Sequence, residues 1–552
     1  MERRFRSGNV YEKWDRRNKN RNIEKFFAGG HREKRYLKGL KGRIQNHLEG
    51  TLRVVSTALI VMIQFGLVLY LPFVLQSLTV YFYFILELCS IIAIVTLVNK
   101  NQSPSFRIAW ISIVLLLPVS GFVLYYLWGR EGGKKRALDQ HILRQIAYGR
   151  KFLTQDEEVY EEYVEDHPVA GRMVKYMVNE GFPLTSGNGV KYYPMGEDAF
   201  EDIFQALENA RKFIFIDFFI VAEGALWDKV HEILKRKLEQ GVEVKFLYDD
   251  FGAAIRTRKY FKQILEHEGM EVRIFNPIHR YTGELYMNYR SHQKIVVVDG
   301  KIGFTGGFNL ADEYANLIER FGVWKDTGVC LVGKAVWDLT VVFLQMWEAC
   351  GGEKEHIDYL KYKKRGKELG DTYCQVISDG PAHNPKNVIE NVYNQMITFS
   401  DEYLYITTPY LVLEDYMQQS LIEAAHRGVD VRIVTPNIPD KKYAKLLTNY
   451  NYGKLLREGV RIYEYTPGFI HAKQILTENA AIVGTINMDY RSFYLHYENG
   501  VWMSGESIQR SIRKDFKKIF HESQEVSYED WQNRPRLWKM IQPILNLFST
   551  LF

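Results

Sequence analysis

A short polar motif occurs twice in the chain, 179 residues apart, and this duplication constrains the fold more than any other feature. The stretches SHQKIVVVDG (291–300) and HAKQILTE (471–478) each place a Lys two residues after a His, and an acid five residues after that Lys. In each half, a strand-like run, KFIFIDFFIV (212–221) or YLYITTPYL (403–411), precedes an amphipathic segment ending in Gly and a second strand-like run. Strands that alternate with helices in this way predict an α/β protein with two similar lobes.

Each copy of the motif places its His and Lys on one face of a strand, because side chains alternate along an extended chain. Each copy then continues into a Gly-rich turn, TGGFN or VGTIN, that ends in Asn. The two halves therefore supply the same three polar residues, namely His292, Lys294 and Asn309 in the first and His471, Lys473 and Asn487 in the second. Gathered between two lobes, they could bind a phosphoryl group and supply a nucleophile and a general acid or base, without a metal or other cofactor.

The two copies differ in their acid, which is Asp299 in the first and Glu478 in the second. The interval from His to Asn is also one residue shorter in the second copy, at 16 against 17 residues. One hypothesis is that the second half site is degraded and the protein catalytically inactive. The other is a shortened hairpin in which a longer acid reaches the same place, and we favour it because the His, Lys and Asn all remain.

Two long uncharged segments precede the duplicated part. Residues 54–86 contain no charged side chain, the apolar character resumes after Glu87, and 108–129 form a second uncharged run. A transmembrane helix needs about 20 mostly apolar residues, and buried helices of soluble domains rarely run so long without charge. The sequence therefore predicts about three transmembrane helices, near 54–76, 80–98 and 109–128.

The first 53 residues form a basic arm with 16 Lys and Arg against 6 Asp and Glu. A basic arm beside a membrane span is usually cytoplasmic and can lie on anionic lipid, and nucleic-acid binding is the alternative. Basic residues also follow the third apolar segment, so three crossings cannot place both groups on one side. Either one apolar segment is re-entrant, or one of the basic groups is not on the cytoplasmic side. We expect a multi-pass protein of the cell membrane, and the face that carries the catalytic domain stays open.

The motifs HQKIVVVD with GGFN, and HAK with GTIN, resemble the paired HKD motifs of the phospholipase D superfamily. Within it, the chain is most similar to bacterial cardiolipin synthases, through NYRSHQK (288–294), TTPYL (407–411) and NMDYRSFYLHYENG (487–500). The similarity runs from about residue 106 to the C-terminus and implies one site between the lobes. The expected domains are a basic arm (1–53), a transmembrane region (54–129), a first lobe (130–360), a second lobe (361–533) and an amphipathic segment (534–552).

The resemblance implies a reaction in which a phosphatidyl group passes from one phosphatidylglycerol to another through a phosphohistidine, releasing glycerol. His292 would be the nucleophile, and His471 would protonate the leaving glycerol and then deprotonate the incoming hydroxyl. The two Lys and two Asn residues would bind phosphate oxygens, and the two motif acids, Asp299 and Glu478, would belong to the catalytic group. Asp326 in WKDTG and Glu498 in HYENG would each steady the histidine of their own half, although solvated surface acids are an alternative.

The expected partners are phosphatidylglycerol and anionic membrane lipid, with no nucleic acid and no cofactor. Other enzymes with the same residues are a phospholipase D and a phosphatidyltransferase with a different acceptor alcohol. A nuclease of the same superfamily is less favoured, because membrane spans bring the site to lipid. The sequence does not fix the oligomeric state, although the duplication indicates that one copy supplies a complete site.

Overall fold

The computed structural model describes residues 80–100, 102–129, 133–277, 289–351, 356–364 and 368–551, together with scattered helical positions between 55 and 74. The predicted basic arm and most of the first predicted transmembrane helix lie outside these residues. Within the described part of the chain, no helix has both the length and the apolar character needed to span a membrane. The predicted transmembrane helices are therefore not confirmed.

The second and third apolar segments form a small helical group. Helix α4 covers Val80–Val98, as expected for 80–98. The single helix predicted over 109–128 is wrong, because the chain forms α5 (Pro104–Leu116), α6 (Pro118–Leu124) and a π-helical turn (Tyr125–Gly129). The break falls at Pro118, since proline lacks an N–H group and disfavours the helical conformation of the residue before it.

Among the described residues, 16 strands join both halves of the chain in one continuous sheet, 15 of them in a single order and the short β5 (Arg290–Ser291) beside β19. The first half of the sheet contains β4 (Glu271–Phe275), β3 (Glu243–Asp249), β2 (Phe213–Phe218), β6 (Lys294–Val298), β7 (Ile302–Gly306), β9 (Gly328–Val332) and β1 (Thr185–Tyr193), in that order. The second half continues with β10 (Thr372–Asp379), β19 (His496–Ser504), β17 (Ala481–Gly484), β16 (Gln474–Thr477), β11 (Tyr403–Thr407), β13 (Asp430–Pro436), β14 (Arg461–Tyr465) and β20 (Ser523–Val526).

The two halves of this sheet repeat each other, which confirms the prediction of two similar α/β lobes. In both, two parallel pairs, β2–β3–β4 or β11–β13–β14, lie beside an antiparallel hairpin, β6–β7 or β16–β17. The central strands β2 and β6 are buried at every position. Strands covered on both faces read as continuous apolar runs rather than as alternating ones, which explains FIFIDF and KIVVV.

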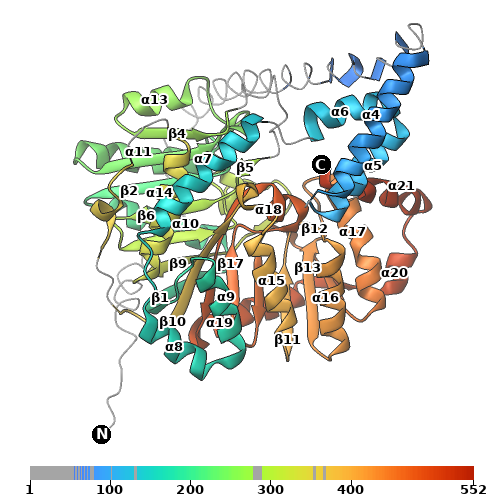
Figure 1. Ribbon diagram of the computed structural model, residues 1–552. Helices are drawn as coiled ribbons and strands as arrows, with labels where there is room; N and C mark the ends of the chain where they lie inside the picture. Colours follow the sequence, from blue (N-terminus) through green and yellow to red (C-terminus); the bar gives the residue numbers. More distant parts are fainter. Residues whose placement is uncertain are drawn as a thin grey trace.

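Helices cover the sheet on its two faces (Figure 1). Those of the first lobe are α10 (Gly196–Glu208), α11 (Ala225–Glu239), α12 (Asp250–Ala253), α13 (Phe261–His267) and α14 (Ala335–Ala349). Those of the second are α15 (Val388–Thr398), α16 (Asp415–His426), α17 (Lys442–Arg457), α18 (Tyr490–Tyr494) and α19 (Glu506–His521). The chain reaches the first lobe through α7 (Gly133–Arg150), α8 (Glu157–Asp166) and α9 (Pro168–Asn179), and ends in α20 (Tyr528–Gln532) and α21 (Arg536–Leu547).

Helices α8 and α9 precede the first lobe in sequence but pack in the core of the second. Tyr163 of α8 and Val174 of α9 share one buried cluster with Ile377 of β10 and Val392 of α15. Another buried cluster lies between the lobes and contains side chains of both. The two lobes are therefore joined by common hydrophobic cores as well as by the sheet, so we expect neither lobe to fold without the other.

Two short strands cross from one lobe to the other and decide where the motif histidines lie. Strand β5 (Arg290–Ser291) ends just before His292 and pairs in parallel with the beginning of β19 in the second lobe. Strand β15 (Gly468–Ile470) ends just before His471 and pairs in parallel with β8 (Val323–Lys325) of the first lobe. Each motif is thus attached to the opposite lobe at its histidine.

Candidate active site

The crossing strands bring the two histidines to the boundary between the lobes. The backbone N–H of His292 donates to the carbonyl of Tyr497 at 2.8 Å, and that of His471 donates to the carbonyl of Lys325 at 2.7 Å. Both imidazoles are buried, with 6% and 7% of their surfaces exposed. The backbone of one lobe therefore fixes the histidine of the other.

Each imidazole contacts a buried carboxylate that also belongs to the other lobe. The Nδ1 atom of His292 lies 2.9 Å from Oε2 of Glu498, and Nδ1 of His471 lies 2.6 Å from Oδ2 of Asp326. The expectation that each acid steadies the histidine of its own half is wrong. The physical reason is the strand crossing, because Tyr497 and Lys325, which hold the histidine backbones, immediately precede Glu498 and Asp326 in the sequence.

The residue that lies against each acid differs between the two lobes. The hydroxyl of Thr485 donates to Glu498, which fixes the longer carboxylate. The corresponding residue of the first lobe is Gly307, where an added Cβ would lie 2.0 Å from Oδ1 of Asp326. The shorter acid therefore requires a glycine beside it, and the longer one is held by a threonine.

The two motif lysines lie on the same face as the histidines, as predicted. The Nζ atom of Lys294 donates to the carbonyl of His292 at 2.6 Å, and Nζ of Lys473 lies 2.8 Å from Nδ1 of His471. Lys473 also donates to the carbonyl of His471. Both ammonium groups are almost fully buried. Buried cations of this kind are costly unless an anion neutralises them, which suits a site for an anionic group.

The two asparagines are buried, and each has one amide atom with no hydrogen-bond partner in the described part of the chain. Asn309 accepts from the N–H of Ile220 at 2.9 Å through Oδ1, and its Nδ2 is the unpaired atom. For Asn487 the unpaired atom is Oδ1. Since buried polar groups are normally hydrogen-bonded, an unpaired amide atom beside the histidine motif indicates a place for a ligand.

Asp299 and Glu478 lie away from this group, so their prediction as catalytic residues is wrong. Asp299 accepts from the N–H groups of Arg211, Lys212 and Phe213 at 2.7–3.2 Å, at the start of β2. It follows the end of β6 opposite to Lys294, which places it about 16 Å further along at ~3.3 Å per residue. Its carboxylate therefore holds the beginning of a strand.

Glu478 has the equivalent position in the second lobe. It accepts from the N–H groups of Asp401, Glu402 and Tyr403 at 3.0–3.4 Å, at the start of β11. The longer side chain thus reaches the same kind of backbone site from a hairpin that is one residue shorter. This agrees with the hypothesis of a shortened hairpin, and the Asp-to-Glu difference leaves the histidine site unchanged.

Burial controls the charge state of the site. Burial and the neighbouring Lys294 hold the pKa of His292 well below its usual range. Burial, followed by Lys473, lowers the pKa of His471 to about 4, although Asp326 opposes this shift. Both imidazoles are therefore neutral near pH 7 in the ligand-free protein, and a neutral imidazole can act as a nucleophile or a base.

The remaining charges of the site are also shifted by burial. The pKa of Lys294 falls to about 7 and that of Lys473 to about 8, in both cases mainly because the ammonium is removed from water. The pKa of Glu498 rises to about 8 for the same reason, against the influence of Lys294. A bound anion would favour the charged form of both lysines.

Sequence analysis missed a third histidine, His496, which is 8% exposed. Its ring centroid lies 5.3 Å from that of His292, and its Nδ1 lies 3.6 Å from Oε1 of Glu498. Neither ring nitrogen has a hydrogen-bond partner among the described residues. The first lobe has Trp324 at the matching position, two residues before its acid, so the comparison HYE against WKD was the available signal.

His292, His496 and Glu498 could together hold a metal ion, because their ligand atoms all lie within 4.8 Å of one another. Two imidazoles and a carboxylate form a ligand set that zinc accepts. The surrounding charges are unfavourable, since burial and then Arg491 and Lys294 lower the pKa of His496 well below its usual range. The same positive field that repels a cation favours a phosphate.

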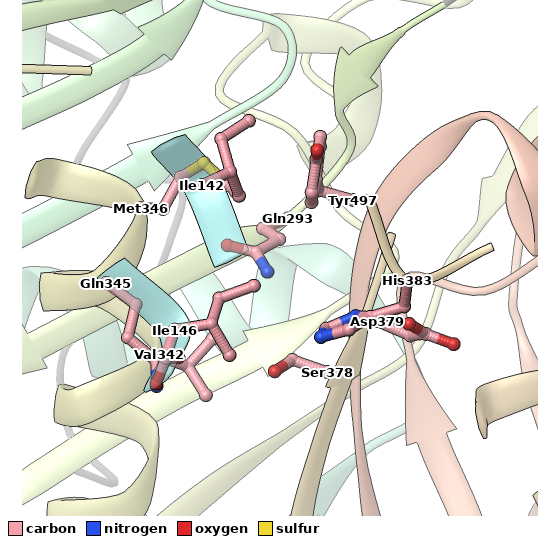
Figure 2. Close-up of a pocket in the computed structure, with 10 residues that line it drawn as sticks. All are labelled: Ile142, Ile146, Gln293, Val342, Gln345, Met346, Ser378, Asp379, His383 and Tyr497. Carbon is pink, nitrogen blue, oxygen red and sulfur yellow. Dashed lines mark hydrogen bonds and ion pairs between the residues drawn. The ribbon is translucent and has the colours of Figure 1, made fainter. Parts of the chain in front are cut away.

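A separate cavity lies between the lobes, on the side of β5 and β19 away from the imidazoles. Gln293 and Tyr497, which alternate with the site residues, point into it together with His383 and Asp379 (Figure 2). Nδ1 of His383 lies 2.8 Å from Oδ1 of Asp379. This cavity contains none of the motif histidines or lysines.

Comparison with known proteins agrees with the geometry. The chain matches the family described as "Cardiolipin synthase, PLD-like domain" over residues 203–347 and 393–520, and the family described as "Phospholipase_D-nuclease N-terminal" over 88–130. Two lobes that share one site with two His-x-Lys motifs define a phospholipase D-like enzyme of the phosphatidyltransferase type. The chain belongs to the cardiolipin synthase family.

The similar proteins include a cardiolipin synthase of Geobacillus kaustophilus, 32% identical and covering 85% of this chain and 93% of its own length. A cardiolipin synthase of Clostridium perfringens is 32% identical over 82% of this chain and 95% of its own. An uncharacterized protein of Streptococcus mutans is 36% identical over 83% and 99%. The crystal structure of phosphatidylserine synthase from Haemophilus influenzae has a TM-score of 0.53 and 14% identity, and covers 69% of this chain and 97% of its own, which shows a shared fold.

Proposed function

We propose that the protein transfers a phosphatidyl group from one phosphatidylglycerol to another, forming cardiolipin and releasing glycerol through a phosphohistidine. One observation carries this proposal: two buried, neutral imidazoles, each held at Nδ1 by a carboxylate of the other lobe, both lie close enough to the two buried lysines for these to lower their pKa values. With Nδ1 engaged, Nε2 is the nitrogen available to the substrate. Two such nitrogens are what a double displacement at phosphorus requires.

In the first step, Nε2 of His292 attacks the phosphorus of phosphatidylglycerol. The bond from phosphorus to the head-group oxygen breaks, and His471 gives a proton to the departing glycerol. His471 has a pKa of about 4 in the free protein, and the negative charge of the bound diester raises it, so that the protonated form becomes accessible. Lys294 and Lys473 neutralise the phosphate oxygens, and the unpaired amide of Asn309 donates to them.

In the second step, a hydroxyl of another phosphatidylglycerol attacks the same phosphorus. His471 takes the hydroxyl proton, the bond from phosphorus to His292 breaks, and the free imidazole is restored. One phosphodiester bond is broken and one is formed, so neither step needs a nucleotide or other energy source. Water would compete with the second alcohol, and a buried site limits that competition.

We also propose that the protein is a multi-pass membrane protein whose α5 and α6 form a re-entrant segment. Large apolar side chains are exposed on this group, including Phe84 at 65% and Leu116 at 70%. Exposed apolar area of this extent suits lipid rather than water. A re-entrant α5–α6 pair, broken at Pro118, would leave two crossings and would place both basic flanks on one side.

The test is to supply purified full-length protein with phosphatidylglycerol labelled in its head group, without nucleotide or added metal, and to follow lipids and free glycerol. We expect cardiolipin and glycerol in equal amounts. Phosphatidic acid with glycerol would identify a phospholipase D instead. No turnover by the folded protein, or equal activity of parent, His292→Ala and His471→Ala, would leave a lipid-binding role.

A further inference from the structure

The two lobes carry similar short stretches, each with exposed apolar and basic residues, at the same place in the fold. After β3 the chain reads IRTRKY (255–260), and after β13 it reads IPDKKY (438–443). Both stretches have Ile at the first position, Arg or Lys then Lys at the fourth and fifth, and Tyr at the sixth. The extra four residues between β3 and its stretch are those of α12. We call 255–260 the first rim loop and 438–443 the second rim loop.

Both rim loops expose their apolar side chains. Ile255 is 40% and Tyr260 62% exposed in the first, and Ile438 is 39% and Tyr443 44% exposed in the second. The basic residues between them are exposed as well, namely Arg258, Lys259, Lys441 and Lys442. An exposed aliphatic residue and a tyrosine flanked by Lys or Arg are typical of a surface that meets the head-group region of a bilayer.

The first rim loop follows the carboxyl end of β3, which lies beside the segment that carries His292. Asp249, the last residue of β3, accepts from the N–H of Ser291, the residue that precedes His292. Arg290 lies over the ring of Phe251 at 5.1 Å, and Phe251 is itself 41% exposed. The loop therefore begins a few residues from the backbone that holds the first catalytic histidine.

The second rim loop has the equivalent place in the second lobe. Its Asp440 accepts from the hydroxyl of Tyr410 at 2.6 Å, and Lys441 lies near enough to His496 to contribute to the lowering of its pKa. The loop leads into α17, on which α21 packs: Nε2 of Gln542 donates to the carbonyl of Leu446 at 3.1 Å. Leu537, Met540 and Ile544 of α21 are more than 60% exposed.

Helices next to the first rim loop and to the second lobe's α17 lie on one side of the molecule. Figure 1 shows α13, which follows the first rim loop, on the upper side of the view together with α4, α5, α6 and α21. We propose that the two rim loops, one on each lobe, dock the mouth of the active site onto an anionic lipid bilayer. Their Ile and Tyr side chains enter the interface, and their Lys and Arg side chains contact lipid phosphates. Two matched contacts on opposite sides of one site hold both lobes at the same depth.

This inference uses the proposed function only to explain why the protein docks on a bilayer, so its first test does not need enzymatic activity. Single cysteines replace Tyr260 and Tyr443 in a Cys89→Ser/Cys350→Ser background, since Cys330 and Cys374 are buried. They are labelled with bimane, and the full chain is reconstituted in phosphatidylglycerol–phosphatidylethanolamine vesicles containing brominated lipid. The matched control is Glu239→Cys, which is exposed at the end of α11, near the start of β3 and so at the opposite end of that strand from the first rim loop.

We expect strong quenching and a blue-shifted emission at positions 260 and 443, and neither at 239. Equal emission at all three positions would overturn the proposal. The second test compares the parent with the variant Ile255→Ser/Tyr260→Ser/Ile438→Ser/Tyr443→Ser. Transfer between vesicle lipids should fall at least tenfold, whereas transfer between lipids in detergent micelles should be unchanged.

Leu360→Ser is the control for the second test, because Leu360 is 56% exposed and belongs to a short turn, Tyr359–Tyr362, whose Tyr362 lies beside Gly300 after β6, away from the site. We expect it to match the parent on both substrates. If the fourfold variant matches the parent on vesicles, the docking role is wrong. If the parent forms no cardiolipin on either substrate, the proposed function fails, and the fluorescence test still decides the docking surface.

Discussion

The Nδ1 atom of His471 lies 2.6 Å from Oδ2 of Asp326, although the two residues belong to different lobes and are 145 positions apart. The pair formed by His292 and Glu498 has the same crossed arrangement, at 206 positions. Each motif imidazole therefore depends on the opposite lobe for its carboxylate. Duplication followed by this exchange makes one site from two halves, and neither half holds a complete histidine–acid pair.

The first prediction concerns Asp326→Asn. An amide in place of the carboxylate can no longer stabilise a protonated His471 or fix its tautomer, so His471 loses its role as general acid. By analogy with other histidine–carboxylate pairs, we expect kcat to fall roughly 10²- to 10⁴-fold. Initial rates of glycerol release measure this, and thermal unfolding shows whether the variant is folded. A folded variant with the parent's kcat would contradict the role of this pair.

The second prediction separates the motif acids from the catalytic acids. Asp299→Asn and Glu478→Gln weaken the contacts with three backbone N–H groups at the start of β2 or β11. We expect each to lower the free energy of unfolding by about 1–3 kcal/mol, because charge-assisted hydrogen bonds are lost. The turnover of the folded protein should stay within about twofold of the parent. A loss like that of Asp326→Asn would return these acids to the catalytic group.

Glu478→Asp is a sharper version of the same test. The turn that contains Glu478 is one residue shorter than the turn that contains Asp299, so we expect an aspartate there to stop short of the N–H groups of Asp401 and Glu402. We expect a stability loss similar to that of Glu478→Gln, although the charge is kept. Equal stability of Glu478→Asp and the parent would show that length is not what selects glutamate here.

The sequence predicted the histidine, lysine and asparagine sets because the duplicated motif places them at fixed strand and turn positions. It did not predict the partners of the histidines, because the crossing depends on β5 and β15, which have only two and three residues. Strands this short have no periodicity to read. His496 was missed for a related reason: a single histidine two residues before an acid has meaning only once the first lobe's Trp324 is seen in the matching position.

The apolar region was predicted less well than the lobes. Composition identified the uncharged runs, but Pro118 divides the last run into α5 and α6. A proline interrupts a helix even where the sequence around it is apolar throughout. The roles of Asp299 and Glu478 were misjudged because motif spacing was treated as spatial proximity. In a strand, five residues span about 16 Å, so an acid at that spacing lies at the far end.

The third prediction concerns pH. Burial lowers the pKa of Lys473 from its usual 10.5 to about 8, so its ammonium loses its proton as the pH rises through 8. Lys294, with a pKa of about 7, loses its proton first. The uncharged amines bind a phosphodiester poorly, so kcat/KM should fall in two steps, near pH 7 and near pH 8. In the complex, the bound anion favours the charged lysine, so the decline in kcat should lie at higher pH.

Lys473→Arg provides the check, since a guanidinium stays charged throughout this range. Whatever its effect on the maximal rate, the step of the decline in kcat/KM near pH 8 should move upward or disappear, and the step near pH 7 should remain. The measurement is a pH profile between 5.5 and 10 for both proteins in a buffer of constant ionic strength. An unchanged decline in the arginine variant would assign the titration to another group.

The fourth prediction concerns His496, a buried imidazole with no hydrogen-bond partner on either nitrogen among the residues described. Leaving such a group unpaired costs stability in the ligand-free protein, and a substrate oxygen that pairs with it recovers that cost. His496→Leu should therefore have two opposite effects. The unfolding temperature of the ligand-free protein should rise or stay the same, and kcat/KM should fall about 10- to 100-fold, as expected for a lost hydrogen bond to a charged phosphate.

His496→Asn should behave differently, because it keeps one donor and one acceptor, and we expect it to retain most of kcat/KM. Trp324→Phe, at the matching position of the first lobe, is the control for a change of ring packing beside a catalytic histidine. If His496→Leu loses stability and activity together, the imidazole only fills space and supports Glu498. If it gains stability while losing activity, the unpaired nitrogens are kept for the substrate, and the second lobe has evolved a phosphate contact where the first lobe has only a packed indole.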